Sequence, residues 1–211
     1  MKTTWTQEER VILSRLKSPI RIQEYLDTLE YSSESRYRSP RSVMRDTKGH
    51  CFDGAVFAAA ALRMLGYRPL IVDMQAVRDD DHVIAVYRKA GCWGAVAKSN
   101  FAGLRFREPI HKNVRELVMS YFESFYNLNR EKTLRKFSRP LDLSAYDRYD
   151  WMVNDEAMEL IGTKLCYIST SSLLTPAMIR GLQPVDQRAY EAGMHGANPA
   201  GLYNPNADAK K

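Results

Sequence analysis

The sequence predicts an α+β fold in which one long apolar helix packs on an antiparallel sheet, with further helices around it. Apolar residues in the first part of the chain recur with the period of about 3.6 residues that is typical of helices. After Gly66 the pattern changes to the two-residue period of strands. The chain has 211 residues, of which 45% are hydrophobic, so it is long enough for one domain with a substantial core.

Two helices are expected in the N-terminal part. Thr6 can cap a helix over residues 7–16 that has acidic residues in its first turn. Ser18 can cap a second helix over residues 19–29, which begins with proline, the residue that tolerates the first helical position best. The polar segment 32–48 that follows is expected to be a loop with a short helical turn after its proline.

An alanine-rich helix follows, and its first residue is a cysteine. The stretch GHCFDGAVFAAAALRMLGY predicts a buried helix from Cys51 to Leu65 that stops at Gly66. Small alanine side chains allow such a helix to lie close to its neighbours, because the distance between packed elements depends on the side chains at the contact. This helix is therefore expected to lie directly on the sheet.

At least three strands are expected after this helix. The apolar run RPLIVDMQAV indicates one buried strand, and DHVIAVYRKAGCWGAVAKS indicates two more around a turn at residues 89–91. Helices are then expected over residues 114–127 with Asn113 as cap, after Asn154, after Thr175 and within residues 183–194, whereas residues 127–150 are expected to be irregular. Residues 1–194 are predicted to form a single domain, and residues 195–211, rich in Gly, Pro and Asn, an extended or mobile tail.

Composition excludes several classes of protein. No apolar run reaches the roughly 20 residues that a membrane-spanning helix needs, so no membrane partner is expected. The N-terminus turns polar at once, which favours a cytoplasmic location. The three cysteines are too few and too scattered for a disulfide framework, so reduced thiols are expected.

The net charge of +6 includes a local basic excess in LNREKTLRKFSRP. This segment could bind nucleic acid, or it could be a solvated basic face. No helix-turn-helix, zinc-finger or RNA-binding pattern accompanies it, so a nucleic-acid partner is not expected. The basic balance favours an acidic partner instead.

Cys51 is a candidate nucleophile because of its place at the start of a helix. The positive end of the helix dipole and the unpaired N–H groups there favour a thiolate and lower the thiol pKa. The same N–H groups can stabilise an oxyanion when a carbonyl carbon is attacked. The alternative is that Cys51 is a small buried hydrophobic residue.

A nucleophilic thiol needs a base, and His82 is the candidate. His82 begins a predicted strand, and the next strand ends at Ser99 and Asn100. Since antiparallel neighbours place the start of one strand beside the end of the next, His82 can meet Ser99 or Asn100 at one edge of the sheet. A polar residue there could orient the imidazole ring. The alternative is a histidine that pairs with the acidic run 79–81.

This order of elements resembles the transglutaminase-like superfamily, a branch of the papain-like cysteine hydrolases. The resemblance covers about residues 43–101, where GHCFDGAVFAAAALRMLGYRPLIV is similar to the family's cysteine-helix block. The segment DDDHVIAVYRKAGCWGAVAKSN is similar to its histidine-strand and tryptophan-strand blocks. The resemblance implies a papain/transglutaminase-like fold, Cys51 as nucleophile and His82 as general base, without a cofactor or a metal.

The third catalytic residue departs from the family pattern. The family has Asp about four residues after its Trp, whereas Ala97 stands four residues after Trp93 in this chain. Asn100 is the best substitute, since an amide can hold an imidazole ring, and Ser99 is the second choice. Ser99 and Trp93 are also expected to contribute to substrate binding.

Two function classes follow from these observations. The first is a cysteine enzyme that hydrolyses an amide or peptide bond or transfers its acyl group, through a Cys51–His82–Asn100 triad. The second is an inactive transglutaminase-like protein that binds partners or acts as a scaffold. A metal site made of His50, Cys51, His82 and Cys92 matches no zinc spacing and has two adjacent ligands, so it is not expected.

Overall fold

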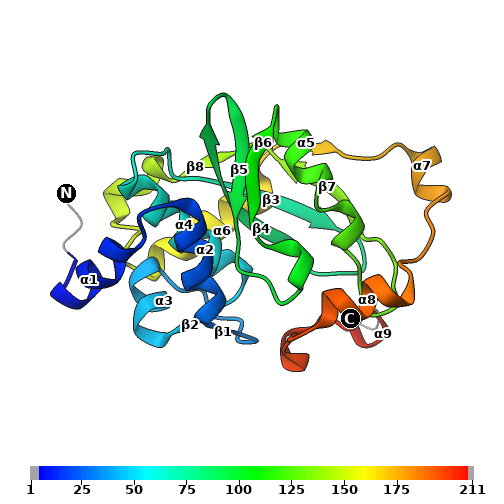
Figure 1. Ribbon diagram of the computed structural model, residues 1–211, viewed down its shortest axis with the longest axis horizontal. Coiled ribbons are helices and arrows are strands. Elements are labelled where there is room, and N and C mark those ends of the chain that lie inside the picture. Colours follow the sequence, from blue (N-terminus) through cyan, green and yellow to red (C-terminus); the bar gives the residue numbers. More distant parts are fainter. Residues whose placement is uncertain (1–4, 209–211) are drawn as a thin grey trace.

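The computed structural model describes residues 5–208, which form an antiparallel sheet with helices on both of its faces (Figure 1). Neighbouring strands follow the order β6-β5-β4-β3-β7-β9, and β8 also pairs with β3. The strands are β3 (Leu70–Ala76), β4 (His82–Lys89), β5 (Cys92–Val96), β6 (Arg107–His111), β7 (Leu134–Ser138), β8 (Leu141–Asp142) and β9 (Thr170–Ser172). A separate two-stranded parallel pair is formed by β1 (Glu30–Tyr31) and β2 (Lys48–Gly49).

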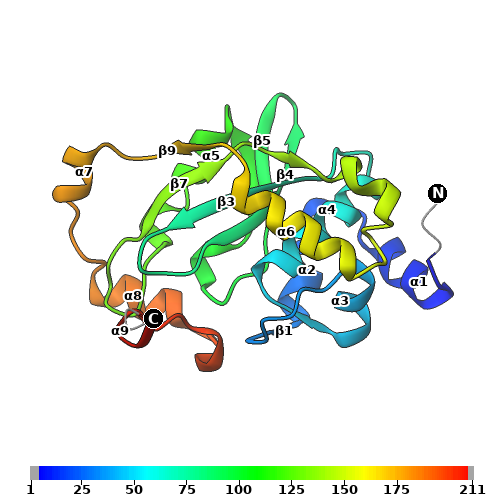
Figure 2. The same ribbon diagram turned by 180° about the vertical axis from the view of Figure 1, so that it is seen from behind.

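The helices gather at two ends of the molecule. Figure 1 shows α1–α4 at one end of the sheet and α7–α9 at the other, and Figure 2 shows α6 crossing beside α2, α3 and α4. The α-helices are α1 (Gln7–Arg15), α2 (Pro19–Thr28), α3 (Pro40–Asp46), α4 (Cys51–Met64), α5 (Val114–Met119), α6 (Glu156–Tyr167), α7 (Pro176–Arg180), α8 (Gln187–Met194) and α9 (Pro205–Asp208). Short 3₁₀ helices are η1 (Ala102–Leu104), η2 (Phe122–Ser124), η3 (Leu143–Tyr149) and η4 (Pro199–Gly201).

The α+β fold class predicted from the sequence is confirmed, and so are the local signals that start its first helices. The Thr6 side chain accepts from the backbone N–H of Glu9, and the Glu9 side chain accepts from the N–H of Thr6, which completes a capping box. The Ser18 side chain caps α2 in the same way, ahead of Pro19.

The alanine-rich helix α4 is buried almost along its whole length, as its composition predicts. Gly54 lies so close to the end of β5 that a Cβ atom there would be 2.2 Å from the Cβ of Lys98. A larger side chain at this position would therefore push α4 away from the sheet. The helix ends at Met64, and Gly66 just beyond it has a φ of +88°, which suits glycine better than any other residue.

The side chains of strand β4 point alternately into two hydrophobic cores, one on each face of the sheet. Val83, Ala85 and Tyr87 face the core formed with α4 and the N-terminal helices. Ile84 and Val86 face the second core, which contains residues of α5, η1 and η2. Because successive strand residues point to opposite faces, the sheet is apolar on both faces.

Two parts of the fold differ from the sequence-based expectation. The segment 127–150 was expected to be irregular, yet β7 and β8 lie within it and pair with β3. The helix expected after Asn113 ends at Met119, and η2 follows it. Pairing with β3, far away in the sequence, buries Leu134 and Phe137 and so stabilises a strand in a segment of basic residues.

The described part of the expected tail folds back on the domain. Residues 195–208 contain η4 and α9, and residues 209–211 lie outside the described part of the chain. Asn100 holds the start of this tail through three hydrogen bonds to main-chain atoms of Asn198 and Gly201. None of the helices between residues 5 and 208 has the length and apolarity needed to cross a membrane.

Candidate active site

Cys51 is the first residue of α4, and its thiol faces the start of β4. The Cys51 Sγ donates a hydrogen bond to the carbonyl oxygen of Asp81 at 3.7 Å. The backbone N–H of Val83 also reaches the sulfur and favours its ionised form. Cys51 is half-buried, so part of its surface faces the solvent. The helix start and the strand start therefore meet at the thiol, as the order of the elements predicts.

The pKa of the Cys51 thiol moves opposite to the expectation from the helix dipole. Burial, together with the nearby carboxylates of Asp80, Asp53 and Asp73, raises this pKa to about 12 against the opposing effect of the Val83 N–H. The expectation of a thiol pKa below that of free cysteine is therefore wrong for this arrangement. Desolvation and neighbouring negative charge outweigh the dipole of the helix.

Two cavities meet at Cys51. The larger has a volume of about 600 Å³ and is lined by Cys51, by residues of the loop 31–37, by strand residues of the sheet and by the C-terminal segment. The smaller, about 30 Å³, is lined by Cys51 together with His82, Ser99 and Asn100. The smaller cavity is large enough for a water molecule. Three of the residues predicted to form the site thus reach one small cavity with the nucleophile candidate.

His82 is the first residue of β4 and is only 4% exposed. Its Nε2–H donates to the carbonyl oxygen of Leu104 at 2.9 Å, which leaves Nδ1 as the unprotonated nitrogen. The ring also lies edge-on to Phe125, with the ring centroids 6.3 Å apart. Burial lowers the His82 pKa to about 4, so the imidazole is neutral at pH 7.

Cys51 and His82 approach the small cavity from different sides. The ring of His82 contacts Leu104 and Phe125, which belong to the second core, whereas α4 packs on the opposite face of the sheet. The thiol donates its hydrogen bond to the Asp81 carbonyl, and the imidazole donates its hydrogen bond to the Leu104 carbonyl. The two groups therefore share a cavity without a direct hydrogen bond between them.

The residues proposed to orient His82 have other partners. The Asn100 side chain donates to the carbonyl oxygens of Asn198 and Gly201 and accepts from the N–H of Asn198. Ser99 Oγ accepts from the N–H of Phe101. Instead of an Asn100 amide, the main-chain carbonyl of Leu104 orients the imidazole ring in this structure.

Trp93 lies far from the thiol along the hairpin. It pairs with Arg88 near the end of β4 and with His111 in β6, whereas His82 stands at the opposite end of β4. Trp93 is half-buried against the second core. Its expected role in substrate binding has no support from this position.

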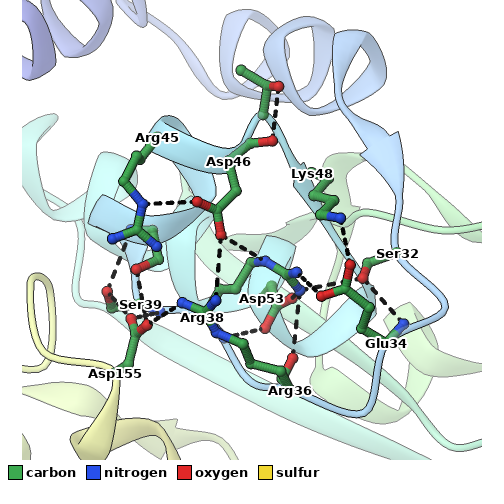
Figure 3. A network of polar contacts seen from close by, with 12 residues as sticks. Ser32, Glu34, Arg36, Arg38, Ser39, Arg45, Asp46, Lys48, Asp53 and Asp155 are labelled. Carbon is green, nitrogen blue, oxygen red and sulfur yellow. Dashed lines mark hydrogen bonds and ion pairs between the residues drawn. The ribbon is translucent and has the colours of Figure 1, made fainter.

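A buried polar network, which the sequence analysis missed, fixes the other side of the helix start. Arg38 is 1% exposed, and its guanidinium contacts Ser32, Glu34, Asp46 and Asp53 (Figure 3). The Asp53 carboxylate accepts from the backbone N–H of Arg38 at 2.7 Å and from that of His50 at 3.2 Å. Acidic residues often occupy the third position of a helix, so Asp53 was the available sequence signal.

Tyr31 is a second residue near the site that the sequence analysis missed. Burial raises the pKa of its phenol, and a smaller opposite effect of the Cys51 backbone N–H shows that the hydroxyl lies near that amide. Tyr31 also lines both cavities. The hydroxyl therefore competes for one of the N–H groups that could hold an oxyanion.

Carboxylates dominate the charge of the larger cavity. Glu34, Asp73, Asp80 and Asp81 line it, and the described lining residues include no lysine or arginine. In the part of the chain that the structure describes, no group of three or more His, Cys, Asp and Glu side chains is arranged to hold a metal ion. His50 lines the larger cavity, but Cys92 stands at the far end of the hairpin, paired with Lys89.

Comparison with known proteins gives no assignment. No protein-family model matches the chain, and no curated protein matches it.

Proposed function

We propose that the protein is a cysteine-dependent enzyme that acts on an amide or peptide bond, by hydrolysis or by acyl transfer, on a papain/transglutaminase-like fold. The observation that carries the proposal is the small cavity that Cys51 and His82 share, at the meeting point of a helix start and a strand start. A general base acts within hydrogen-bond reach or through one water molecule, and this cavity has room for one.

The proposed chemistry begins with a neutral pair. The thiol proton of Cys51 moves through a water molecule in the small cavity to Nδ1 of His82, while Nε2–H of the ring stays bonded to the Leu104 carbonyl. The sulfur forms a bond to the carboxamide carbon, and the carbon–nitrogen bond breaks as the imidazolium gives its proton to the leaving amine. Water or a second amine then attacks the thioester and releases the acyl group. Because the thiol pKa is about 12 and the imidazole pKa about 4, no thiolate–imidazolium pair exists before the reaction.

The larger cavity supports a neutral or cationic substrate rather than an acidic one. Its charged lining residues are mostly carboxylates, which repel a negatively charged peptide. Glu34 is paired with Arg38 and Lys48, whereas Asp73 is bonded to the neutral amide of Gln75. An acidic partner, which the overall charge of the chain favours, would have to bind at another surface.

An activated ester tests the proposal without knowledge of the natural substrate. The chain with Cys92→Ser and Cys166→Ser is incubated with p-nitrophenyl acetate, and both p-nitrophenol release and acetylation of Cys51 are followed. The proposal predicts acetyl-Cys51, followed by its hydrolysis and continued release, all of which Cys51→Ala abolishes. Acetylation that is never hydrolysed, or release that survives in Cys51→Ala, would contradict it.

An inactive protein that binds peptides through the same cavity is the second candidate. The raised thiol pKa and the engagement of Asn100 with the C-terminal segment favour it. The same experiment separates the two candidates, because a binding protein gives no turnover of the ester.

A further inference from the structure

One wall of both cavities is formed by the C-terminal part of the chain itself. Gly201 and Tyr203 line both cavities, and Ala200 and Leu202 line the larger one. We call residues 198–203 the C-terminal cover. Figures 1 and 2 both show the chain after α8 returning toward β1, beside the start of α4.

The cover is held through its main chain. The Asn100 amide donates to the carbonyl oxygens of Asn198 (2.9 Å) and Gly201 (3.1 Å), and its oxygen accepts from the N–H of Asn198 (2.7 Å). The Asn198 side chain in turn donates to the carbonyl oxygen of Tyr31 at 3.1 Å. The contacts of Asn100 therefore recognise a peptide backbone, independent of the side chains that the backbone carries.

Gly201 fits tightly against this recognition site. A Cβ atom at this position would lie 2.8 Å from two ring carbons of Tyr31 and 3.3 Å from Nδ2 of Asn100. Because 2.8 Å is well inside van der Waals contact, a larger side chain at this position would have to displace the half-buried ring of Tyr31, so the site favours glycine. The fit thus adds a size requirement to the backbone recognition.

The cover can leave without opening the core. Residues 198–203 have no buried side chain, and Asn198 and Gly201 are held to the domain by hydrogen bonds that water can replace. Segments with few buried apolar contacts detach at a low free energy compared with global unfolding. Detachment would open both cavities on the side of Cys51.

We propose that Asn100 and Tyr31 form a peptide-backbone subsite beside Cys51, and that the C-terminal cover fills this subsite in the resting protein. The ligand class is a peptide segment with glycine at the position of Gly201, because the subsite reads main-chain atoms and leaves no room for a side chain there. The cover then limits access to the thiol, and this regulatory consequence for turnover rests on the proposed function.

Access to the thiol is measured by alkylation of Cys51 with iodoacetamide, in a chain that carries Cys92→Ser and Cys166→Ser. Two variants release the cover: a chain that ends at Ala197, and full-length Gly201→Leu. Each is expected to react about tenfold faster than the parent, since the measured rate scales with the fraction of molecules whose site is open. Gly181→Leu is the matched control, because a Cβ atom at Gly181 meets no atom closer than 3.7 Å.

A peptide of residues 195–206 then tests the subsite in trans. Added to the chain that ends at Ala197, it is expected to slow alkylation of Cys51 again, whereas the same peptide with leucine in place of Gly201 is expected to have no effect. Equal alkylation rates in all variants, or no protection by the peptide, would overturn the proposal. Faster alkylation together with peptide protection but without ester turnover would retain the subsite and contradict the enzymatic function alone.

Discussion

The two sides of the α4 start differ in how their titratable groups are paired. On one side, Arg38 and Asp53 are fully buried, yet each is satisfied by several charged or polar partners (Figure 3). On the other side, the Cys51 thiol and the His82 ring each donate one hydrogen bond to a main-chain carbonyl. Burial keeps both side chains in their neutral forms. The paired charges of Arg38 and Asp53 stabilise the helix start, whereas the neutral Cys51 thiol and His82 ring can still exchange a proton.

Removal of Arg38 is expected to give the largest loss of stability. Arg38→Met leaves the buried Asp53 carboxylate without its cation, and breaking a buried ion pair in this way costs about 3 to 5 kcal/mol. The control is Arg36→Met, whose side chain is 49% exposed and should cost less than about 1 kcal/mol. Urea unfolding of both variants measures the difference. Equal losses would show that the network does not stabilise the helix start.

Asp73→Asn is expected to stabilise the protein above neutral pH. Burial, with a contribution from the charge of Asp81, raises the pKa of the Asp73 carboxyl to about 7, from 3.8 in the unfolded chain. The unfolded chain therefore ionises first, and stability falls as the pH rises from about 4 to about 7. The variant removes this loss, so at about pH 8 it should gain up to about 4 kcal/mol over the parent.

Asp142→Asn is the control for this prediction, because its carboxyl pKa is lowered rather than raised. Its hydrogen bonds to Arg68 and to the backbone N–H of Ser144 outweigh the effect of burial. This variant should lose stability above the unfolded pKa, opposite in sign to Asp73→Asn. A gain in both variants would mean that the removal of negative charge in general, and not burial at Asp73, stabilises the protein.

The pH dependence of stability below neutrality should weaken when His82 is replaced. Burial lowers the pKa of His82 from 6.5 to about 4, so the unfolded chain binds the proton first as the pH falls. The stability that the neutral ring contributes is present above about pH 6.5 and is lost between about pH 6.5 and 4, by about 3 kcal/mol. His82→Gln should remove this part of the slope in thermal unfolding curves. An unchanged slope would assign it to His50, whose pKa is also lowered to about 4.

The elements with local sequence signals were predictable. Caps at Thr6 and Ser18, the alanine-rich α4 and the turn through Ala90 and Gly91, which both have positive φ, each depend on residues close together in the chain. Strand β7 was not predictable in this way, because its basic segment is stabilised by pairing with β3, about 60 residues earlier in the chain.

The same distinction explains which part of the candidate site was predictable. Antiparallel pairing of β4 with β5 brings His82 to the edge where Ser99 and Asn100 lie, and the sequence order was sufficient to predict this. The face to which His82 points depends on which core the sheet buries there, and the partner of Asn100 stands 98 residues later. Neither of these long-range contacts leaves a pattern in the local sequence.

Ser99→Ala is expected to have the smallest effect. Ser99 Oγ makes one local hydrogen bond, to the N–H of Phe101, and a single bond of this kind contributes about 1 kcal/mol or less. Alkylation of Cys51 should be unchanged, because the Leu104 carbonyl and not Ser99 orients the ring of His82. A strong decrease in the alkylation rate would transfer the orienting role to Ser99.

Whether His82 accepts the proton of Cys51 can be read from the alkylation rate of that thiol. The parent chain carries Cys92→Ser and Cys166→Ser, so that only Cys51 can react with iodoacetamide. Its labelling rate is compared with that of the same chain carrying His82→Gln, at a pH where the imidazole is neutral. The variant should react at least about tenfold more slowly than the parent, because positioned base catalysis contributes at least this much. Equal rates would contradict it and leave Cys51 as a buried thiol beside a histidine with no chemical role.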